Sequence, residues 1–128
     1  MTYLLDTHSL IWFIGANPKL PDKAKVIIED TNAVCFISVA SFWEIAIKMS
    51  LGKLKMDIPF TDLENWVISN KMHILPVNFN HTLQLSQLPF HHRDPFDRTL
   101  IAQALQTDLI LISKEELFDK YNVKRVWN

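Results

Sequence analysis

The sequence predicts an α/β fold, in which a central parallel sheet of four to five strands is covered by helices on both faces in a three-layer α/β/α arrangement. Short apolar runs rich in β-branched residues alternate with longer segments whose apolar residues recur at helical spacing. This alternation is typical of right-handed crossovers between parallel strands. A length of 128 residues suffices for one core and not for two, so residues 1–128 are expected to form a single domain.

Short apolar runs bounded by turn residues predict the strands. Those expected to form the buried sheet are Tyr3–Leu5, Val34–Ile37, Ile74–Pro76 and Leu109–Ile112, with Arg125–Trp127 as a candidate fifth. Because helical segments separate them, the strands are expected to run parallel, and ligands of such sheets bind at the carboxyl ends of the strands. The chemistry of the protein is therefore expected at that edge.

Amphipathic segments predict the helices between the strands. They are Ser9–Ile14, Pro21 to Asp30, Val39–Ser50, Phe60–Asn70, Phe79–Gln87 and Pro95–Gln106, with a last short turn over Lys114–Lys120. In Val39–Ser50 the apolar residues recur at three- and four-residue spacing, and Gly52 is placed to end this helix. Pro95 suits the first position of its helix because its fixed φ is already helical.

Composition excludes several classes of protein. No apolar run approaches the ~20 residues that span a membrane, and no secretory leader opens the chain, so a cytoplasmic protein without membrane contact is expected. Cys35 is the only cysteine and stands in an apolar run, which favours a small buried residue over a thiol nucleophile. The net charge of -1 lacks the basic excess of nonspecific nucleic-acid binders, so RNA contact must rely on a local patch or on metal ions.

Acidic residues stand close to the ends of the predicted strands. They are Asp6 after the first strand, Glu44 in the helix after the second, Asp94 and Asp97 at the start of the helix before the fourth, and Glu115 after the fourth. Each could instead have a purely structural role, because acids at helix N-termini cap free amides and interact with the helix dipole.

Capping explains some of these acids better than others. Asp6 and Asp94 could each cap the helix that follows, and Ser113–Glu116 has the spacing of a capping box. Ser38 is the better cap for the helix that carries Glu44, which leaves Glu44 in the second turn without that role. Since several strand ends each deliver an acid with no evident basic partner, a shared site explains the pattern better than coincident caps.

Carboxylates held close together repel one another, which raises their pKa values and opposes folding unless a cation neutralises them. Oxygen ligands suit Mg²⁺ or Mn²⁺, and such an ion can activate a water for attack on a phosphodiester. The pattern therefore predicts a hydrolytic nuclease. No histidine has metal-ligand spacing, and no Gly-rich phosphate loop or Gly-flanked serine is present, so zinc, nucleotide-cofactor and acyl-transfer enzymes lack support.

Basic and aromatic residues leave further alternatives open. His91, His92, Arg93 and Arg98 could hold a phosphate, although Arg98 stands four residues after Asp94 and could pair with it instead. Large aromatic residues are concentrated in the first and third predicted helices, at Trp12, Phe13, Phe42 and Trp43. Most are expected in the core, and an exposed remainder would form a contact surface for a protein partner.

Four segments resemble, in order, the motifs of VapC-like PIN-domain toxins of type II toxin–antitoxin systems. They are YLLDTHSLIWF, ISVASFWEIAIK, DPFDRTLIAQA and LISKEELFDKY, and they extend over nearly the whole chain. The acid after the first strand is weakly specific by itself, whereas DPFDR-x-LIAQA preceded by a Ser-x-x-Ser-x-x-Glu helix is specific in combination. The resemblance implies a Mg²⁺- or Mn²⁺-dependent endoribonuclease that forms a dimer and is inhibited by a small antitoxin whose tail occupies the active-site groove.

Carried over to this sequence, the resemblance implies that Asp6 and Asp97 are the principal metal ligands. Glu44 would complete the site directly or through water, and Asp94 would be auxiliary. The fourth acidic position of the family, commonly Asp in a Thr-x-Asp pattern, falls here on Glu115. This departure means that a longer side chain has to take the place of the aspartate.

The leading hypothesis is therefore an endoribonuclease in which these acids hold the metal and a water attacks the phosphorus. Ser38 would support the ligands by hydrogen bonding, and Arg98 is a further candidate for a supporting role. The alternative is a non-catalytic module with the same fold that binds a partner protein or RNA. A phosphoacceptor switch has less support, because the central aspartate and strand-end lysine that it requires are not found.

Overall fold

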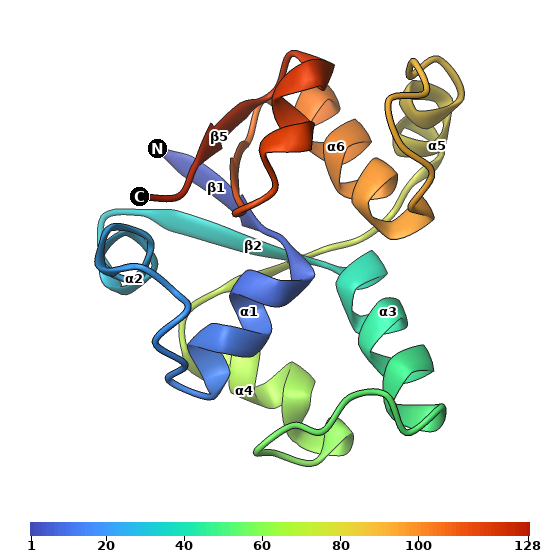
Figure 1. Cartoon of the computed structure of the whole chain (residues 1–128). Coiled ribbons are helices and arrows are strands. Elements are labelled where there is room, and N and C mark those ends of the chain that lie inside the picture. Colours follow the sequence, from blue (N-terminus) through green and yellow to red (C-terminus); the bar gives the residue numbers. More distant parts are fainter.

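The computed structural model describes residues 1–128 and contains a five-stranded sheet in which all neighbouring strands run parallel (Figure 1). The strands follow the order β3-β2-β1-β4-β5 across the sheet. Their bounds are β1 Thr2–Leu5, β2 Val34–Ser38, β3 His73–Leu75, β4 Ile110–Ile112 and β5 Lys124–Val126. The prediction of a parallel sheet is confirmed, and the candidate fifth strand is present as β5.

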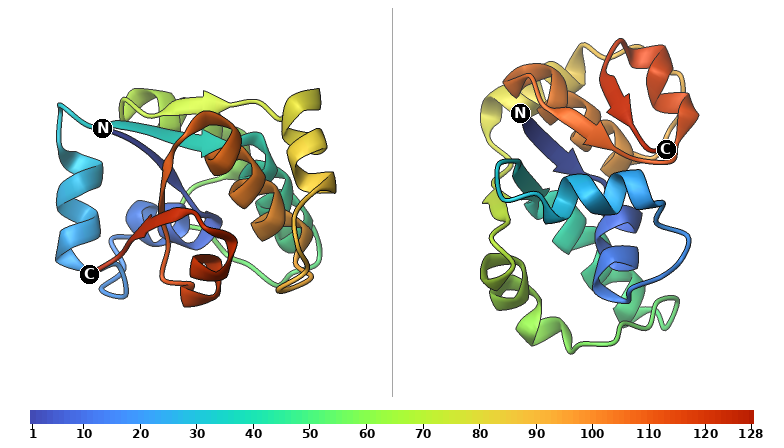
Figure 2. Two further views of the ribbon diagram at one scale, coloured as in Figure 1. Left: turned by 90° about the horizontal axis from the view of Figure 1, so that it is seen from above. Right: turned by 90° about the vertical axis from the view of Figure 1, so that its left-hand side faces the viewer.

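Helices cover both faces of this sheet (Figure 2). The α-helices are α1 Thr7–Ile14, α2 Asp22–Glu29, α3 Val39–Ser50, α4 Leu63–Ser69, α5 Phe79–Ser86 and α6 Pro95–Thr107, and the 3₁₀ helices are η1 Phe60–Asp62 and η2 Glu116–Tyr121. One face packs against α1 to α4, and the other packs against α5, α6 and η2. The predicted three-layer α/β/α arrangement is therefore confirmed.

The central strands bury side chains in both layers. In β1, Leu5 belongs to the apolar cluster on the side of α1 to α4, and Leu4 belongs to the cluster on the side of α6. In β4, Ile112 and Leu111 divide in the same way, and all four side chains are fully buried. Successive side chains of a strand point to opposite faces, so a sheet covered on both sides requires continuous apolar runs.

The order of the strands reverses beside β1. The chain runs from β1 to β2 and β3 on one side, and then returns to place β4 and β5 on the other. Ligands of open α/β sheets bind at the carboxyl ends of the strands where such a reversal occurs. Asp6 directly follows β1, and its amide donates to the carbonyl of Ile112 at the end of β4 at 3.1 Å. Asp6 therefore stands at this crevice.

The ends of α3 follow their sequence signals. The Ser38 hydroxyl accepts a hydrogen bond from the amide of Ala40 at 3.0 Å, as expected of an N-cap. Gly52 follows the last residues of α3 with a φ of 69°, a conformation that glycine adopts without a steric penalty. The predicted bounds of this helix are confirmed.

Two other helix predictions need correction. The segment Phe60–Asn70 is not one helix, since it starts as η1 and continues as α4. Ser113–Glu116 is not a capping box, because the Ser113 hydroxyl accepts from the amide of Glu115 at 3.0 Å and closes a short turn. The following 3₁₀ helix begins only at Glu116, so the geometry that a capping box requires does not form.

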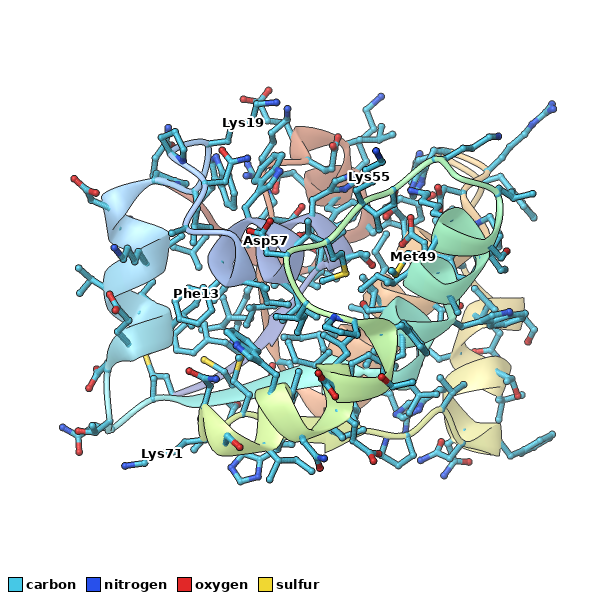
Figure 3. All side chains as sticks on the ribbon, turned by 90° about the horizontal axis from the view of Figure 1, so that it is seen from below. Phe13, Lys19, Met49, Lys55, Asp57 and Lys71 are labelled. Carbon is cyan, nitrogen blue, oxygen red and sulfur yellow. The ribbon has the colours of Figure 1, made fainter.

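On the lower side of the molecule, α1, α4 and the segment that follows α3 pack against one another (Figure 3). Phe13 of α1 makes an edge-to-face contact with Trp66 of α4, with ring centroids 5.9 Å apart. Gly15 ends α1 beside Asp57, where a Cβ atom would lie 3.2 Å from the Asp57 carboxylate, so the small residue permits this close approach. None of the helices combines the length and apolar character needed to cross a membrane.

Candidate active site

Asp6 is a buried carboxylate at the junction of β1 and α1. Its Oδ1 accepts hydrogen bonds from the Ser9 amide at 2.9 Å and from the Ser9 hydroxyl at 2.6 Å, so the predicted cap is present. Burial raises the pKa of Asp6, and the hydroxyls of Ser113 and Ser9 act in the opposite direction. Asp6 is only 4% exposed, whereas a carboxylate that serves only as a cap usually stays in water.

Asp94 and Asp97 lie at the start of α6. Oδ1 of Asp94 accepts from the amides of Phe96 and Asp97, each at 2.9 Å, which confirms Asp94 as the N-cap. Asp94 is exposed, whereas Asp97 is partly buried and makes no capping hydrogen bond with its side chain. The two acids therefore have different local roles, and only Asp97 lacks a structural explanation.

The charges of the other predicted site acids all act on Asp97. Burial is the largest cause that raises the pKa of Asp97 to about 7, and the negative charges of Asp94, Asp6, Glu44 and Glu115 follow in that order. Residues from the ends of β1 and β4 and from the starts of α3 and α6 are thus gathered around one carboxylate. A carboxyl group with a pKa near neutrality is typical of a functional site.

Glu44 projects from the second turn of α3 and is 4% exposed. Its Oε2 accepts from Nζ of Lys48 at 2.6 Å, and its buried Oε1 has no hydrogen-bond partner. The expectation that the acids have no basic partner is therefore wrong for Glu44, because Lys48 lies one helical turn further along the same face. An unpartnered buried acceptor costs about 1–3 kcal/mol, so Oε1 is suited to receive an additional ligand.

Glu115 lies beyond β4 on the rim of a small pocket of about 100 Å³. The pocket is lined by Asp6, His8, Trp12, Lys114, Glu115 and Trp127. Glu115 is exposed and contributes the weakest of the charges that act on Asp97. It shares a pocket with Asp6, and its predicted role as the fourth acidic ligand stays a prediction.

Ser38 and Arg98 have structural contacts that account for both residues. Ser38 is fully buried as the cap of α3 and has no hydrogen bond to an acid, so its predicted support of the ligands stays a prediction. Arg98 is 5% exposed and donates to the carbonyls of Pro89 and Leu88 and to the Tyr121 hydroxyl. It therefore neither pairs with the Asp94 side chain nor is accessible to a phosphate, because the preceding loop folds back over it.

His92 has a closer relation to the acids than the sequence indicated. Its Nε2 lies 3.5 Å from Oδ2 of Asp97, and its Nδ1 lies 2.8 Å from the Tyr121 hydroxyl. Burial lowers the pKa of His92, and the charge of Asp94 opposes this effect. The position of His92 just before the DPFDR segment was a usable signal, but it suggested phosphate binding and not contact with Asp97.

The sequence matches the PIN domain over residues 3–124. The chain belongs to the PIN-domain family. Members of this family are generally nucleases, and a gathering of acids at the carboxyl ends of a parallel sheet suits that chemistry. No curated protein matches the sequence significantly.

Solved structures with the same fold come from toxin–antitoxin complexes. They include VapBC2 from Rickettsia felis bound to promoter DNA, with 16% identity, 100% of both chains covered and a TM-score of 0.74. VapBC-1 from nontypeable Haemophilus influenzae has 17% identity over 98% of this chain and 97% of its own, with a TM-score of 0.67. FitAcB from Neisseria gonorrhoeae has 17% identity over 100% of this chain and 97% of its own, with a TM-score of 0.63. These similarities show that this chain has the same fold as the solved structures.

The donor set of this PIN domain fits a divalent cation. In the conformation described, no three acidic, histidine or cysteine side chains are arranged to ligate one ion directly. Oε1 of Glu44 is nonetheless buried without a partner, and the negative charges of four other acids act on Asp97. Carboxylate oxygens are the ligands that Mg²⁺ and Mn²⁺ prefer, so the residues present suit either ion.

Proposed function

We propose that this PIN domain is a Mg²⁺- or Mn²⁺-dependent endoribonuclease that hydrolyses phosphodiester bonds in RNA. The observation that carries the proposal is the set of acids around Asp97, whose pKa is raised to about 7 by burial first and then by the charges of these acids. Such a concentration of like charge disfavours the ionised form, and a cation would relieve the repulsion. A carboxylate cluster that is unfavourable without metal is better explained by catalysis than by stability.

Asp6, Asp97 and Glu44 would hold the ion, with Asp94 auxiliary and Glu115 as an outer ligand. A bound Mg²⁺ or Mn²⁺ orients an attacking water, eases the loss of its proton and offsets the charge that grows on the phosphate. The two Ser9 hydrogen bonds to Oδ1 hold the Asp6 carboxylate in one orientation. Positioning of this kind reduces the rearrangement that metal binding would require.

Exposed basic residues near the acids would bind the substrate. Lys114 lines the same pocket as Asp6 and Glu115, and Arg93 is exposed in the loop just before α6. Contacts of lysine and arginine with phosphate oxygens position a nucleic acid without reading its sequence. A net charge of -1 makes this local patch, and not the overall field, the basis of RNA binding.

We also propose that the protein is the toxin of a toxin–antitoxin pair, that it forms a homodimer, and that a small antitoxin protein inhibits it in the cytoplasm. Val39, Trp43, Ile47 and Leu51 are exposed and spaced four residues apart, so they form one apolar stripe along α3. The Trp43 ring also packs edge-to-face against Phe96 beside Asp97, with centroids 5.3 Å apart. Exposed apolar surface of this kind, adjoining the acids, is suited to a protein partner. The VapBC and FitAB complexes that share the fold support this assignment.

The test is cleavage of a mixed pool of structured RNA by protein from which any co-purified small protein has been removed. Wild type is expected to cleave with Mg²⁺ or Mn²⁺ and to be inactive with EDTA. Asp97→Asn is expected to lower the cleavage rate at least 100-fold because it removes a metal ligand. Loss of a residue that only supports a ligand by hydrogen bonding already costs up to about 100-fold. Asp108→Asn is the matched control, because it makes the same change at the exposed opposite end of α6.

The alternative is a non-catalytic PIN domain that binds a partner protein or RNA. Cleavage that is indifferent to EDTA and to Asp97→Asn, or no cleavage by the antitoxin-free wild type, would favour it. An Asp6→Asn variant distinguishes the two functions further. Under the proposed function it binds RNA and does not cut it, whereas under the alternative it behaves as wild type in every assay.

A further inference from the structure

The Tyr121 hydroxyl is the centre of a hydrogen-bond network behind the acids. Its oxygen accepts from the backbone amides of His91 and His92, each at 3.0 Å, and from Nη1 of Arg98 at 3.2 Å. Tyr121 is 3% exposed and Arg98 is 5% exposed, so water does not compete for these positions. A phenol oxygen has at most two lone pairs and one hydrogen, so three donors already saturate its capacity as an acceptor.

This saturation determines which way the bond to the His92 ring runs. Nδ1 of His92 lies 2.8 Å from the Tyr121 oxygen, a distance that requires a hydrogen between them. Since the oxygen has no lone pair left, the phenol hydrogen is the one that is shared, and Nδ1 is the acceptor. A neutral imidazole that accepts at Nδ1 carries its hydrogen on Nε2.

The Nε2 end of the His92 ring lies beside Asp97. Nε2 is buried and has no hydrogen-bond partner, and Oδ2 of Asp97 lies 3.5 Å from it. A normal N–H···O bond needs the two atoms about 0.4 Å closer, so the bond requires a shift of the Asp97 side chain. Oδ2 of Asp97 is nonetheless an acceptor beside this unsatisfied buried nitrogen.

We propose that Arg98 and Tyr121 fix the tautomer of His92, so that its Nε2 hydrogen orients the Asp97 carboxylate for metal binding. The inference rests on the proposed function and deepens it, because it assigns positioning roles to residues that do not touch the ion. Metal-ligating carboxylates are commonly held by such donors, and removal of the donor typically weakens metal binding 10- to 100-fold. The proposal also assigns a role to the buried Arg98. It acts on the site through Tyr121, and not by binding phosphate or by pairing with Asp94.

Two substitutions of His92 distinguish the contribution of its Nδ1 contact with Tyr121 from that of its Nε2 contact with Asp97. In His92→Gln the side-chain amide places an N–H donor where Nε2 stands, so the contact with Asp97 is kept. In His92→Asn the shorter amide occupies the position of Nδ1, so the contact with Tyr121 is kept and the one with Asp97 is lost. Both variants leave the Tyr121 hydroxyl with its other three donors, and thermal unfolding checks that both are folded.

The experiment combines ¹⁵N NMR of the His92 ring in the metal-free protein with Mn²⁺ titration of the three proteins. In wild type, Nδ1 is expected to show the shift of an unprotonated nitrogen and Nε2 that of a protonated one. Mn²⁺ is expected to bind at least 10-fold more weakly to His92→Asn and within about threefold of wild type to His92→Gln. RNA cleavage should follow the same order.

Each contrary result has a definite meaning. A wild-type spectrum with the hydrogen on Nδ1 overturns the inference, whatever the protein does to RNA. Equal Mn²⁺ affinities for both variants, whether weakened or unchanged, overturn it while leaving the proposed function intact. Failure of the wild type to bind Mn²⁺ and to cleave RNA overturns the proposed function and this inference together. A wild-type spectrum with the hydrogen on Nε2, together with weaker Mn²⁺ binding by His92→Asn than by His92→Gln, supports the proposed function and this inference.

Discussion

Nζ of Lys48 lies 2.6 Å from Oε2 of Glu44, and the other oxygen of the same carboxylate is buried without a partner. The ion pair therefore neutralises the acid that projects from α3. A metal ion that binds Glu44 has to compete with the lysine or share the carboxylate with it. Under the proposed function, Lys48 is therefore expected to oppose metal binding and to stabilise the metal-free protein.

Removal of the lysine is expected to affect stability and metal binding in opposite directions. Lys48→Met should lower the free energy of unfolding in EDTA by about 1–2 kcal/mol, because it leaves a buried carboxylate unpaired while Lys48 itself is partly exposed. The same variant should bind Mn²⁺ more tightly than wild type. Urea unfolding and Mn²⁺ titration measure the two effects, with Lys53→Met as the exposed control. Weaker Mn²⁺ binding by Lys48→Met contradicts this account.

Metal-free stability is expected to fall as pH rises, because of Asp97. Its pKa is raised from 3.8 to about 7 in the folded state, so the protonated form is favoured on folding and the benefit is lost as pH rises through about 7. Asp97→Asn removes this dependence and should be more stable than wild type in EDTA at pH 8, by roughly 1–3 kcal/mol after allowance for partial exposure. The advantage should shrink towards pH 4.

Thermal unfolding of both proteins between pH 4 and pH 8 measures this effect, with Asp108→Asn as the control. Addition of Mn²⁺ at pH 8 should reverse the order, because the wild type gains a ligand that the variant lacks. A variant that is less stable than wild type at pH 8 in EDTA would show that Asp97 is not under electrostatic strain.

Acid is expected to weaken the packing of α5 through His81. This residue is 2% exposed, its Nδ1 accepts from the Asn78 amide at 3.1 Å, and burial lowers its pKa below 6.5. A lowered histidine pKa means that stability is complete above pH 6.5 and is lost as pH falls, since the unfolded chain takes up the proton first. His81→Asn keeps an acceptor near the position of Nδ1 and does not titrate. Its urea midpoint should therefore change less than that of wild type between pH 7.5 and pH 5, and an equal change would exclude His81 as the cause.

The apolar stripe on α3 is expected to form a contact between protein chains. Ile47→Lys places a charge in the middle of the stripe, and it should raise the dissociation constant of the proposed homodimer at least tenfold if the stripe is its interface. Light scattering after size exclusion over a range of concentrations measures the change. Val26→Lys, at an exposed position of α2, is the matched control. A dimer unaffected by Ile47→Lys would exclude the stripe as the homodimer interface.

Much of the fold could be predicted from local patterns. The run that contains Leu4 and Leu5 is apolar on both of its faces, as a strand covered by two helical layers requires, and Val39–Ser50 has both a helical period and its two end signals. The 3₁₀ character of η1 and η2 was missed, because short helices of this kind are determined by packing more than by their own residues.

The placement of the acids of the candidate site could be predicted from the sequence, whereas the other contacts around them could not. Parallel topology brings Asp6 and Glu115 to one edge from their positions after strands, and the Pro95 signal places Asp94 and Asp97 at a helix start. The partners of Arg98 could not be predicted, since Tyr121 is 23 residues away and Pro89 lies in an irregular loop. The spacing in the sequence indicated Asp94 as the partner of Arg98. In the fold, the guanidinium donates to buried acceptors instead.

The sequence by itself thus determined the parallel three-layer architecture and the acids that converge at its carboxyl edge, because strand alternation and helix signals depend on neighbouring residues. Only the tertiary structure decided the raised pKa values of Asp6 and Asp97 and the orientation of the neighbouring side chains. Burial and the summed charge around Asp97 arise from segments far apart in the chain, as does the network that joins Arg98, Tyr121 and His92. Electrostatic and hydrogen-bond energies depend on distance and solvent exposure in three dimensions, and these quantities have no local signature in the sequence.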